Sequence, residues 1–282
     1  MTNLVNGMNY ALLFSPASGG NASAAILSAL FNPNPPTTAV TTGNPITDLK
    51  LAQANKTVDV AREAKDPLVA RDLAAFTKAV TNATSVQAAL TNPAVMKVLL
   101  TANNLSNYID YPALARKALM SDPSDTKSLV NQLGNAAFLS AAKTFDFAKN
   151  GLAALQNPKT IATLANAYTE VLWRRSLDAA TPGLSNALTF LGQAHAITSG
   201  DSILGDPTNR TVVLTALGIP PQIAFQSLTA QEQAVSSRVK IADFQKSSYV
   251  TSLTDQYLLT MQQQAQANSG NSWAALSAGL LA

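Results

Sequence analysis

The side chains that most often perform catalysis are scarce in this chain. It contains one histidine, His195, and no cysteine, which excludes disulfides, thiolate nucleophiles and zinc–thiolate sites. A Ser-His-Asp triad or a histidine-based metal site would have to be built around His195. Its neighbours from Gly192 to Ile197 are small or apolar, and no carboxylate stands close in sequence. We therefore interpret His195 as a structural residue.

One pair fits a catalytic motif formally. Ser140 and Lys143 have the S-x-x-K spacing of penicillin-recognising enzymes, which would place a hydroxyl and an amine on one helix face. The accompanying S-D-N and K-T-G elements are absent, and those enzymes need an antiparallel sheet that this sequence does not predict. We interpret the match as coincidence.

Paired carboxylates offer little chemistry either. Glu63 with Asp66 and Asp122 with Asp125 stand at expected helix junctions, where acids cap helices and offset the helix dipole. No glycine-rich phosphate loop of either common pattern is present. The sequence predicts no catalytic residue, no cofactor and no metal site, and we expect a protein that is not an enzyme.

Aromatic and charged side chains gather once, on a long predicted helix that begins after Asn157-Pro158. Glu170 and Arg174 form an i,i+4 pair, and Tyr168 and Trp173 have the spacing of packed aromatics. The alternative is a recognition surface formed by Tyr168, Glu170, Trp173, Arg174 and Arg175, since tryptophan and arginine are frequent interface hot spots.

The elements that carry these residues are predicted to be helices. An Asx-Pro pair suits a helix start, because the Asx side chain accepts from free N–H groups and proline needs no partner. Such pairs occur at Asn44-Pro45, Asp66-Pro67, Asn92-Pro93, Asp122-Pro123, Asn157-Pro158 and Asp206-Pro207. Further starts are predicted at Thr181-Pro182 and at the capping box Thr229-Ala230-Gln231-Glu232. Apolar residues follow with helical spacing, so the fold class is all-α, a helical bundle.

The sequence also indicates an internal duplication. The run from Leu90 to Ile109 aligns without a gap with the run from Leu204 to Ile223. We expect an all-α domain over residues 46–260, with related halves at about 66–150 and 158–260.

Charge marks the ends of this domain. Asp, Glu, Lys, Arg and His are absent before Asp48 and after Asp255. We expect a flexible Ser/Asn/Pro-rich arm over residues 1–45 and an uncharged tail over 261–282.

A net charge of +3, thinly spread, argues against nucleic acid as a partner. No segment predicts a membrane span or a cleavable signal peptide.

Several motifs together resemble one family. They are Ser128–Leu133, Asn157–Leu184, Asp201–Pro207, Leu217–Pro220 and Ala234–Val239. In order and spacing they resemble the bacterial domain-of-unknown-function 1217 family over residues 46–260. The resemblance implies an all-helical fold with related halves, an alphaproteobacterial origin and an association with flagellar genes. It implies no catalytic residues.

Three functions remain open at this stage. The first is a flagellum-associated structural or assembly protein that binds protein partners, including flagellar components. It would act in the cytoplasm or be exported by the flagellar route without a cleaved signal. The second is a cytoplasmic chaperone or regulator that binds a helical partner in an apolar groove. The third is an enzyme of unrecognised type.

Overall fold

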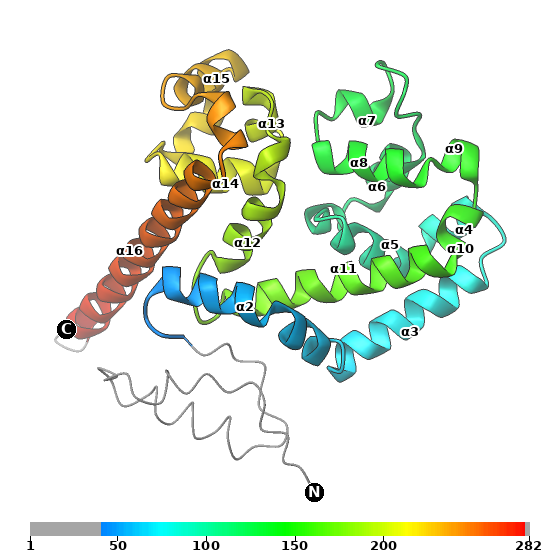
Figure 1. The fold of residues 1–282 in the computed structure, drawn as a ribbon, viewed down its shortest axis with the longest axis horizontal. Coiled ribbons are helices and arrows are strands. Elements are labelled where there is room, and N and C mark those ends of the chain that lie inside the picture. Colours follow the sequence, from blue (N-terminus) through cyan, green and yellow to red (C-terminus); the bar gives the residue numbers. More distant parts are fainter. Residues whose placement is uncertain (1–40, 280–282) are drawn as a thin grey trace, which may run out of the picture.

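The computed structural model describes the backbone of residues 41–279 and the side chains of residues 41–268. The all-α prediction is confirmed, because the described chain forms helices and turns and contains no strand (Figure 1). The elements of the first half are α2 (Pro45–Glu63), α3 (Pro67–Thr81), α4 (Val86–Thr91), α5 (Pro93–Ala102), η2 (Ser106–Tyr108), α6 (Pro112–Met120), α7 (Leu129–Gln132), α8 (Ala136–Phe145), α9 (Phe147–Asn150) and α10 (Ala153–Gln156). Those that follow are α11 (Pro158–Leu177), α12 (Leu184–Gln193), η3 (Ala194–Ala196), α13 (Gly200–Leu204), α14 (Pro207–Ala216), η4 (Pro221–Phe225), α15 (Leu228–Ser236), η5 (Ile241–Gln245) and α16 (Ser247–Gly279).

Five of the six Asx-Pro pairs begin helices, as predicted. The Asx side chain accepts a hydrogen bond from a first-turn N–H at the start of α2, α3, α5, α11 and α14, and proline is the first helical residue each time. The pair at Asp122 fails. Its carboxylate accepts from both the N–H and the hydroxyl of Ser124, which closes a local turn instead of opening a helix.

Two other predicted starts are wrong by about two residues. Helix α12 begins at Leu184 and not at Pro182, because Gly183 stands before it with φ +85°. A side chain at Gly183 would also meet the Tyr257 hydroxyl. Helix α15 begins at Leu228, since the hydroxyl of Ser227 and not that of Thr229 accepts from the N–H of Ala230.

The described chain contains two hydrophobic cores. The first core joins α3–α10 to the N-terminal half of α11, and the second joins α2, the C-terminal half of α11, α12–α15, η5 and α16. Helix α11 therefore belongs to both cores. Tyr168 lies in the first and Trp173 in the second, and at about 100° per residue these two side chains point about 140° apart around the helix axis. The predicted halves, 66–150 and 158–260, need this correction: α11 is shared.

Elements of the two halves correspond at a constant distance along the chain. Pro207, the first residue of α14, stands 114 residues after Pro93, the first residue of α5. The last residues of the two helices are also 114 residues apart, because both helices are ten residues long. The same offset relates the buried Phe76 and Phe190. We name residues 66–122 together with α11 the first module, and residues 180–236 together with α16 the second module, because α11 packs on α5 and α16 packs on α14. The correspondence supports the interpretation that the chain arose by duplication.

Backbone details repeat as well. Ser85 and Ser199 cap α4 and α13 with their hydroxyls. After α5 the N–H of Leu105 donates to the carbonyl of Leu100, and after α14 the N–H of Ile219 donates to that of Leu214. The left-handed residues that these turns require are Asn104 and Gly218, which also stand 114 apart.

Beyond the modules the halves differ. Four short helices, α7–α10, separate α6 from α11, whereas only η5 separates α15 from α16. Helix α11 packs on α5, and α16 packs in the same way on α14. Residues 261–279 of the expected uncharged tail continue α16 as helix. The flexibility expected of residues 1–40 and 280–282 lies outside the described residues.

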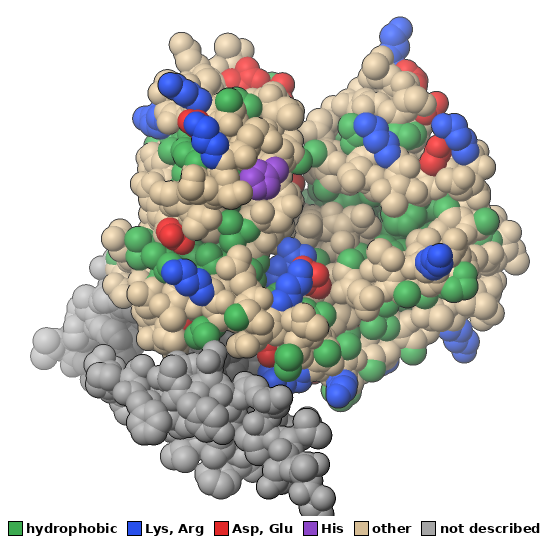
Figure 2. All heavy atoms as spheres, viewed as in Figure 1, with side chains coloured by type: hydrophobic (Ala, Val, Ile, Leu, Met, Phe, Trp, Pro, Cys, Tyr) green, Lys and Arg blue, Asp and Glu red, His purple; other side chains and the backbone are tan. Residues whose placement is uncertain are grey.

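The two halves also touch away from α11. Gly205, after α13, approaches the carbonyl of Gly134 in the turn between α7 and α8 so closely that there is no room for a Cβ atom. The space-filling view shows a hollow between the halves (Figure 2). Because the first core includes α7 and α8, this backbone contact links it to the second module.

Candidate functional site

The five residues considered as an interaction surface do not lie together on one surface of the folded protein. Tyr168 and Trp173 are 1% and 3% exposed and fill the two cores, so the prediction is wrong for them. Glu170 and Arg174 are partly buried, and only Arg175 is exposed. The spacing of Tyr168 and Trp173 on α11 directs them into two different cores and not to a common surface.

The ion pair on α11 is extended by a second helix. The Glu170 carboxylate lies 3.4 Å from Arg174 and 2.7 Å from the Lys56 ammonium of α2. Arg174 also donates to the Thr189 hydroxyl of α12, at 2.8 Å. These contacts connect α2, α11 and α12, which is the structural role that the sequence favoured for this pair.

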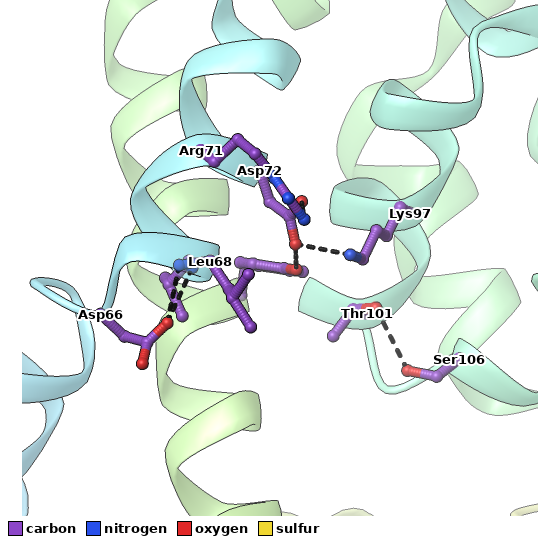
Figure 3. A network of polar contacts seen from close by, with 9 residues as sticks. Asp66, Leu68, Arg71, Asp72, Lys97, Thr101 and Ser106 are labelled. Atoms are coloured by element: carbon purple, nitrogen blue, oxygen red, sulfur yellow. Dashed lines mark hydrogen bonds and ion pairs between the residues drawn. The ribbon is translucent and has the colours of Figure 1, made fainter. Parts of the chain in front are cut away.

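Tyr168 is the centre of a different polar network, which sequence reasoning missed. Its hydroxyl donates to the carboxylate of Asp72 on α3, at 2.8 Å. The same carboxylate accepts from the Lys97 ammonium of α5, at 2.5 Å, and Arg71 lies 3.7 Å away (Figure 3). Arg175 lies close enough to Tyr168 to favour its ionised form. We name Arg71, Asp72, Lys97, Tyr168 and Arg175 the tyrosine cluster.

The charges of this network shift two pKa values in opposite directions. Partial burial opposes ionisation of Asp72, but hydrogen bonds from Lys97 and Tyr168 and the charges of Lys97 and Arg71 outweigh it and lower the pKa of this carboxyl. Burial, and then the hydrogen bond to Asp72 and the charge of Asp72, raise the pKa of Tyr168. Tyr168 is therefore held as a neutral donor and cannot serve as a base near neutral pH.

The second module contains a buried tyrosine in the same setting. Tyr257 of α16 packs over α12 and α14 and accepts from the amide of Asn186, at 3.3 Å. Asn186 stands 114 residues after Asp72. Burial raises the pKa of Tyr257 as well.

These two tyrosines predict an alkaline loss of stability. Because folding favours their neutral hydroxyls, their contribution is complete below about pH 10 and is lost as pH rises further. In denaturant unfolding between neutral pH and pH ~11, Tyr168→Phe should show a shallower fall in unfolding free energy than the wild type. The exposed-site control Tyr111→Phe should follow the wild-type curve. Identical curves for all three proteins would contradict the assignment.

The residues considered for catalysis lie apart from one another. His195 is exposed in η3, and its Nδ1 lies 2.8 Å from the carbonyl of Phe244. Since a carbonyl can only accept, Nδ1 carries the proton and ties η3 to η5. Ser140 and Lys143 lie on the exposed face of α8. Of the remaining acids considered, Asp66 caps α3, and Asp125 accepts from the N–H of Lys127 in the loop after α6.

An open pocket of about 370 Å³ lies beside Asp48, between α2, the segment that joins α11 to α12, and α16. The Asp48 carboxylate accepts from the Thr41 and Thr42 hydroxyls, the Thr42 N–H and the Thr181 hydroxyl, at 2.7 to 3.1 Å. These bonds saturate the carboxylate. Gln262 of α16 donates to the carbonyl of Gly43 beside the same pocket. The arrangement ties the residues before α2 to the body and leaves Asp48 no capacity for a ligand.

Two exposed aromatic side chains stand at equivalent positions. Tyr111, before α6, is 63% exposed, and Phe225, at the end of η4, is 92% exposed. They are 114 residues apart. Each is accompanied by a further exposed apolar side chain, Ile109 in the first module and Leu228 in the second. The alignment of Leu90–Ile109 with Leu204–Ile223 stopped two residues short of this pair, so its extension would have found them.

The comparisons with known proteins define the class of the protein. A family model described as "Protein of unknown function (DUF1217)" matches residues 102–250, and the chain belongs to this family. The match extends from the end of α5 to the start of α16, within the 46–260 range expected from the motifs. No curated protein matches the sequence significantly.

A solved structure shares the fold. The crystal structure of protein AGR_C_984 from Agrobacterium tumefaciens is similar with a TM-score of 0.67 and 22% sequence identity, over 79% of this chain and 94% of that chain. At 22% identity, this similarity shows a common fold and carries no information about function. In residues 41–279 no helix has both the length and the hydropathy that crossing a bilayer requires.

Proposed function

We propose that this protein is a non-enzymatic adaptor that binds a protein partner through the exposed aromatic positions of its two modules. The observation that carries the proposal is the equivalence of Tyr111 and Phe225. Both are aromatic, both are largely exposed, and they stand 114 residues apart, which is the offset that relates the two modules. Exposed aromatics at one module position alone would be an ordinary surface feature.

The geometry suits recognition. Tyr111 is the N-cap residue of α6, and Phe225 is the last residue of η4, immediately before the short turn into α15. Side chains anchored on ordered backbone lose little further conformational freedom on binding, and aromatic rings bury a large apolar area. A partner with two apolar contact points could engage both modules at once, which raises its effective affinity beyond that of either contact.

The cellular setting is proposed on other grounds. The resemblance of the sequence to a family associated with flagellar genes supports a role as a structural or assembly accessory protein of the flagellum. The absence of cysteine and the low charge of the sequence are compatible with passage through an export channel.

Motility tests both parts of the proposal. An in-frame deletion in the native host should shrink the swimming halo, and the wild-type gene should restore it. The double variant Tyr111→Ser/Phe225→Ser should fail to restore the halo although its circular dichroism and thermal unfolding match the wild type. The matched control is Val58→Ser, which removes an apolar side chain that is also 63% exposed but lies on α2.

The outcomes separate the two parts. A full halo in the deletion strain would refute the flagellar role. A full halo in the strain that carries the folded double variant would refute the aromatic surface and leave the flagellar role standing.

A further inference from the structure

The tyrosine cluster contains charges that the corresponding positions of the second module lack. The positions 114 residues after Arg71, Asp72 and Lys97 hold Ser185, Asn186 and Thr211. Gln264 stands seven residues after Tyr257, as Arg175 stands seven residues after Tyr168. The buried tyrosine is kept in both modules, and all four charges are replaced by uncharged polar residues in the second.

In both modules a buried tyrosine joins two helices by a hydrogen bond. Tyr168 bonds to Asp72 between α3 and α11, and Tyr257 bonds to Asn186 between α12 and α16. Each tyrosine is fully buried. In the second module the tyrosine oxygen accepts from a neutral amide, whereas in the first the hydroxyl donates to a carboxylate. A buried tyrosine in this position therefore does not require the three cations and the carboxylate that surround Tyr168.

The two tyrosines differ in the cations around them. A carboxylate opposes ionisation of each tyrosine, Asp72 for Tyr168 and Asp178 for Tyr257. Only Tyr168 also has cations, Arg175 and Arg71, that favour its ionised form. Within the tyrosine cluster, three cations face one carboxylate, which leaves a formal excess of two positive charges. In a chain with only 12% charged residues, this is a local concentration of charge.

The cations keep donors available to solvent. The Arg71 side chain is 71% exposed and the Lys97 side chain 47%, whereas that of Asp72 is 17% exposed. Arg175 is exposed on α11. The Asp72 carboxylate accepts from one donor of the Lys97 ammonium and so orients it (Figure 3). The other two ammonium donors and the guanidinium groups of Arg71 and Arg175 remain outside this bond.

We propose that the tyrosine cluster of the first module is a binding site for an acidic peptide segment of a partner protein. Carboxylate side chains match its exposed guanidinium and ammonium donors in charge and in hydrogen-bonding geometry. The site lies on α3, α5 and α11 and is independent of the aromatic positions that carry the proposed function. The second module, which lacks the charges, does not bind such a segment.

The test uses the full chain and a fluorescein-labelled peptide of alternating glutamate and alanine, followed by fluorescence anisotropy at low and at physiological ionic strength. The key variant gives the first module the residues of the second: Arg71→Ser, Asp72→Asn, Lys97→Thr and Arg175→Gln. Its folding is checked by thermal unfolding. The control is Lys127→Ser/Lys143→Thr, which changes the net charge equally at exposed lysines elsewhere.

We expect saturable binding that weakens with salt, and a loss of about tenfold or more in affinity for the key variant, from several charged contacts of modest individual strength. The control should bind within about twofold of the wild type, because long-range attraction is screened. Equal weakening in both variants, or no saturable binding by the wild type, would overturn the proposal. Tighter binding of a labelled single-stranded oligonucleotide than of the peptide would overturn the assignment to an acidic peptide.

Discussion

Replacing Phe76 by alanine is expected to lower the free energy of unfolding by about 3–5 kcal/mol, and Phe190→Ala should cost a similar amount. Both rings are fully buried, and removal of either leaves a cavity that a packed core closes only in part. The two substitutions should destabilise different cores. Phe76 belongs to the first core, whereas Phe190 belongs to the second and packs edge-on against Phe244.

Hydrogen exchange followed by mass spectrometry would locate these effects. Phe76→Ala should speed exchange in α3, α5 and the N-terminal half of α11, and Phe190→Ala should do so in α12, α14 and the C-terminal half of α11. Val58→Ala, at an exposed position, serves as the control and should leave exchange unchanged. A uniform rise across all helices in both variants would show that the cores open as one unit.

Gly205→Ala is expected to separate the two halves of the molecule. The added methyl group would overlap with the carbonyl oxygen of Gly134, which is backbone and cannot rotate away. Overpacking of this kind costs about 1–3 kcal/mol or forces the backbone to move. We expect a lower melting temperature and a larger radius of gyration in small-angle X-ray scattering, since α7 and α8 must withdraw from the turn after α13.

The matched control is Gly192→Ala. Gly192 lies within α12, and a Cβ atom there would meet no neighbouring atom within 4 Å. This variant should keep the wild-type radius of gyration and gain slightly in helix propensity. An unchanged radius and melting temperature for Gly205→Ala would show that the Gly134 contact does not hold the halves together.

Local chemistry made the helices predictable from the sequence, but it did not make the site predictable. The Asx-Pro signal acts within one turn, so it succeeded at five positions and failed only where Asp122 found a nearer donor in Ser124. The duplication was visible because α5 and α14 keep both their length and their apolar positions. Burial of Tyr168 and Trp173 was not visible, because a single helical period cannot reveal that α11 changes its buried face half-way along.

The tyrosine cluster depends on contacts that are distant along the chain. Asp72 and Tyr168 are 96 residues apart, and Asp72 and Lys97 are 25 apart. No local pattern links them, and only the packing of α3, α5 and α11 brings them together. Comparison of the two modules, once their offset is known, is what distinguishes charges needed for packing from charges that are free for another role.

The position of α2 has a consequence for synthesis on the ribosome. Leu49 and Ala52 of this helix are buried in the second core, together with residues as late as Leu258. Translation proceeds from the N-terminus, so α2 emerges more than 200 residues before α16, the last of the three helices, α11, α12 and α16, against which it packs. The first core can close as soon as α11 has emerged, while the part of α2 that α16 covers is still exposed. The earliest described helix to be made is therefore among the last to be fully covered, and until α16 is made its remaining apolar surface is open to a chaperone.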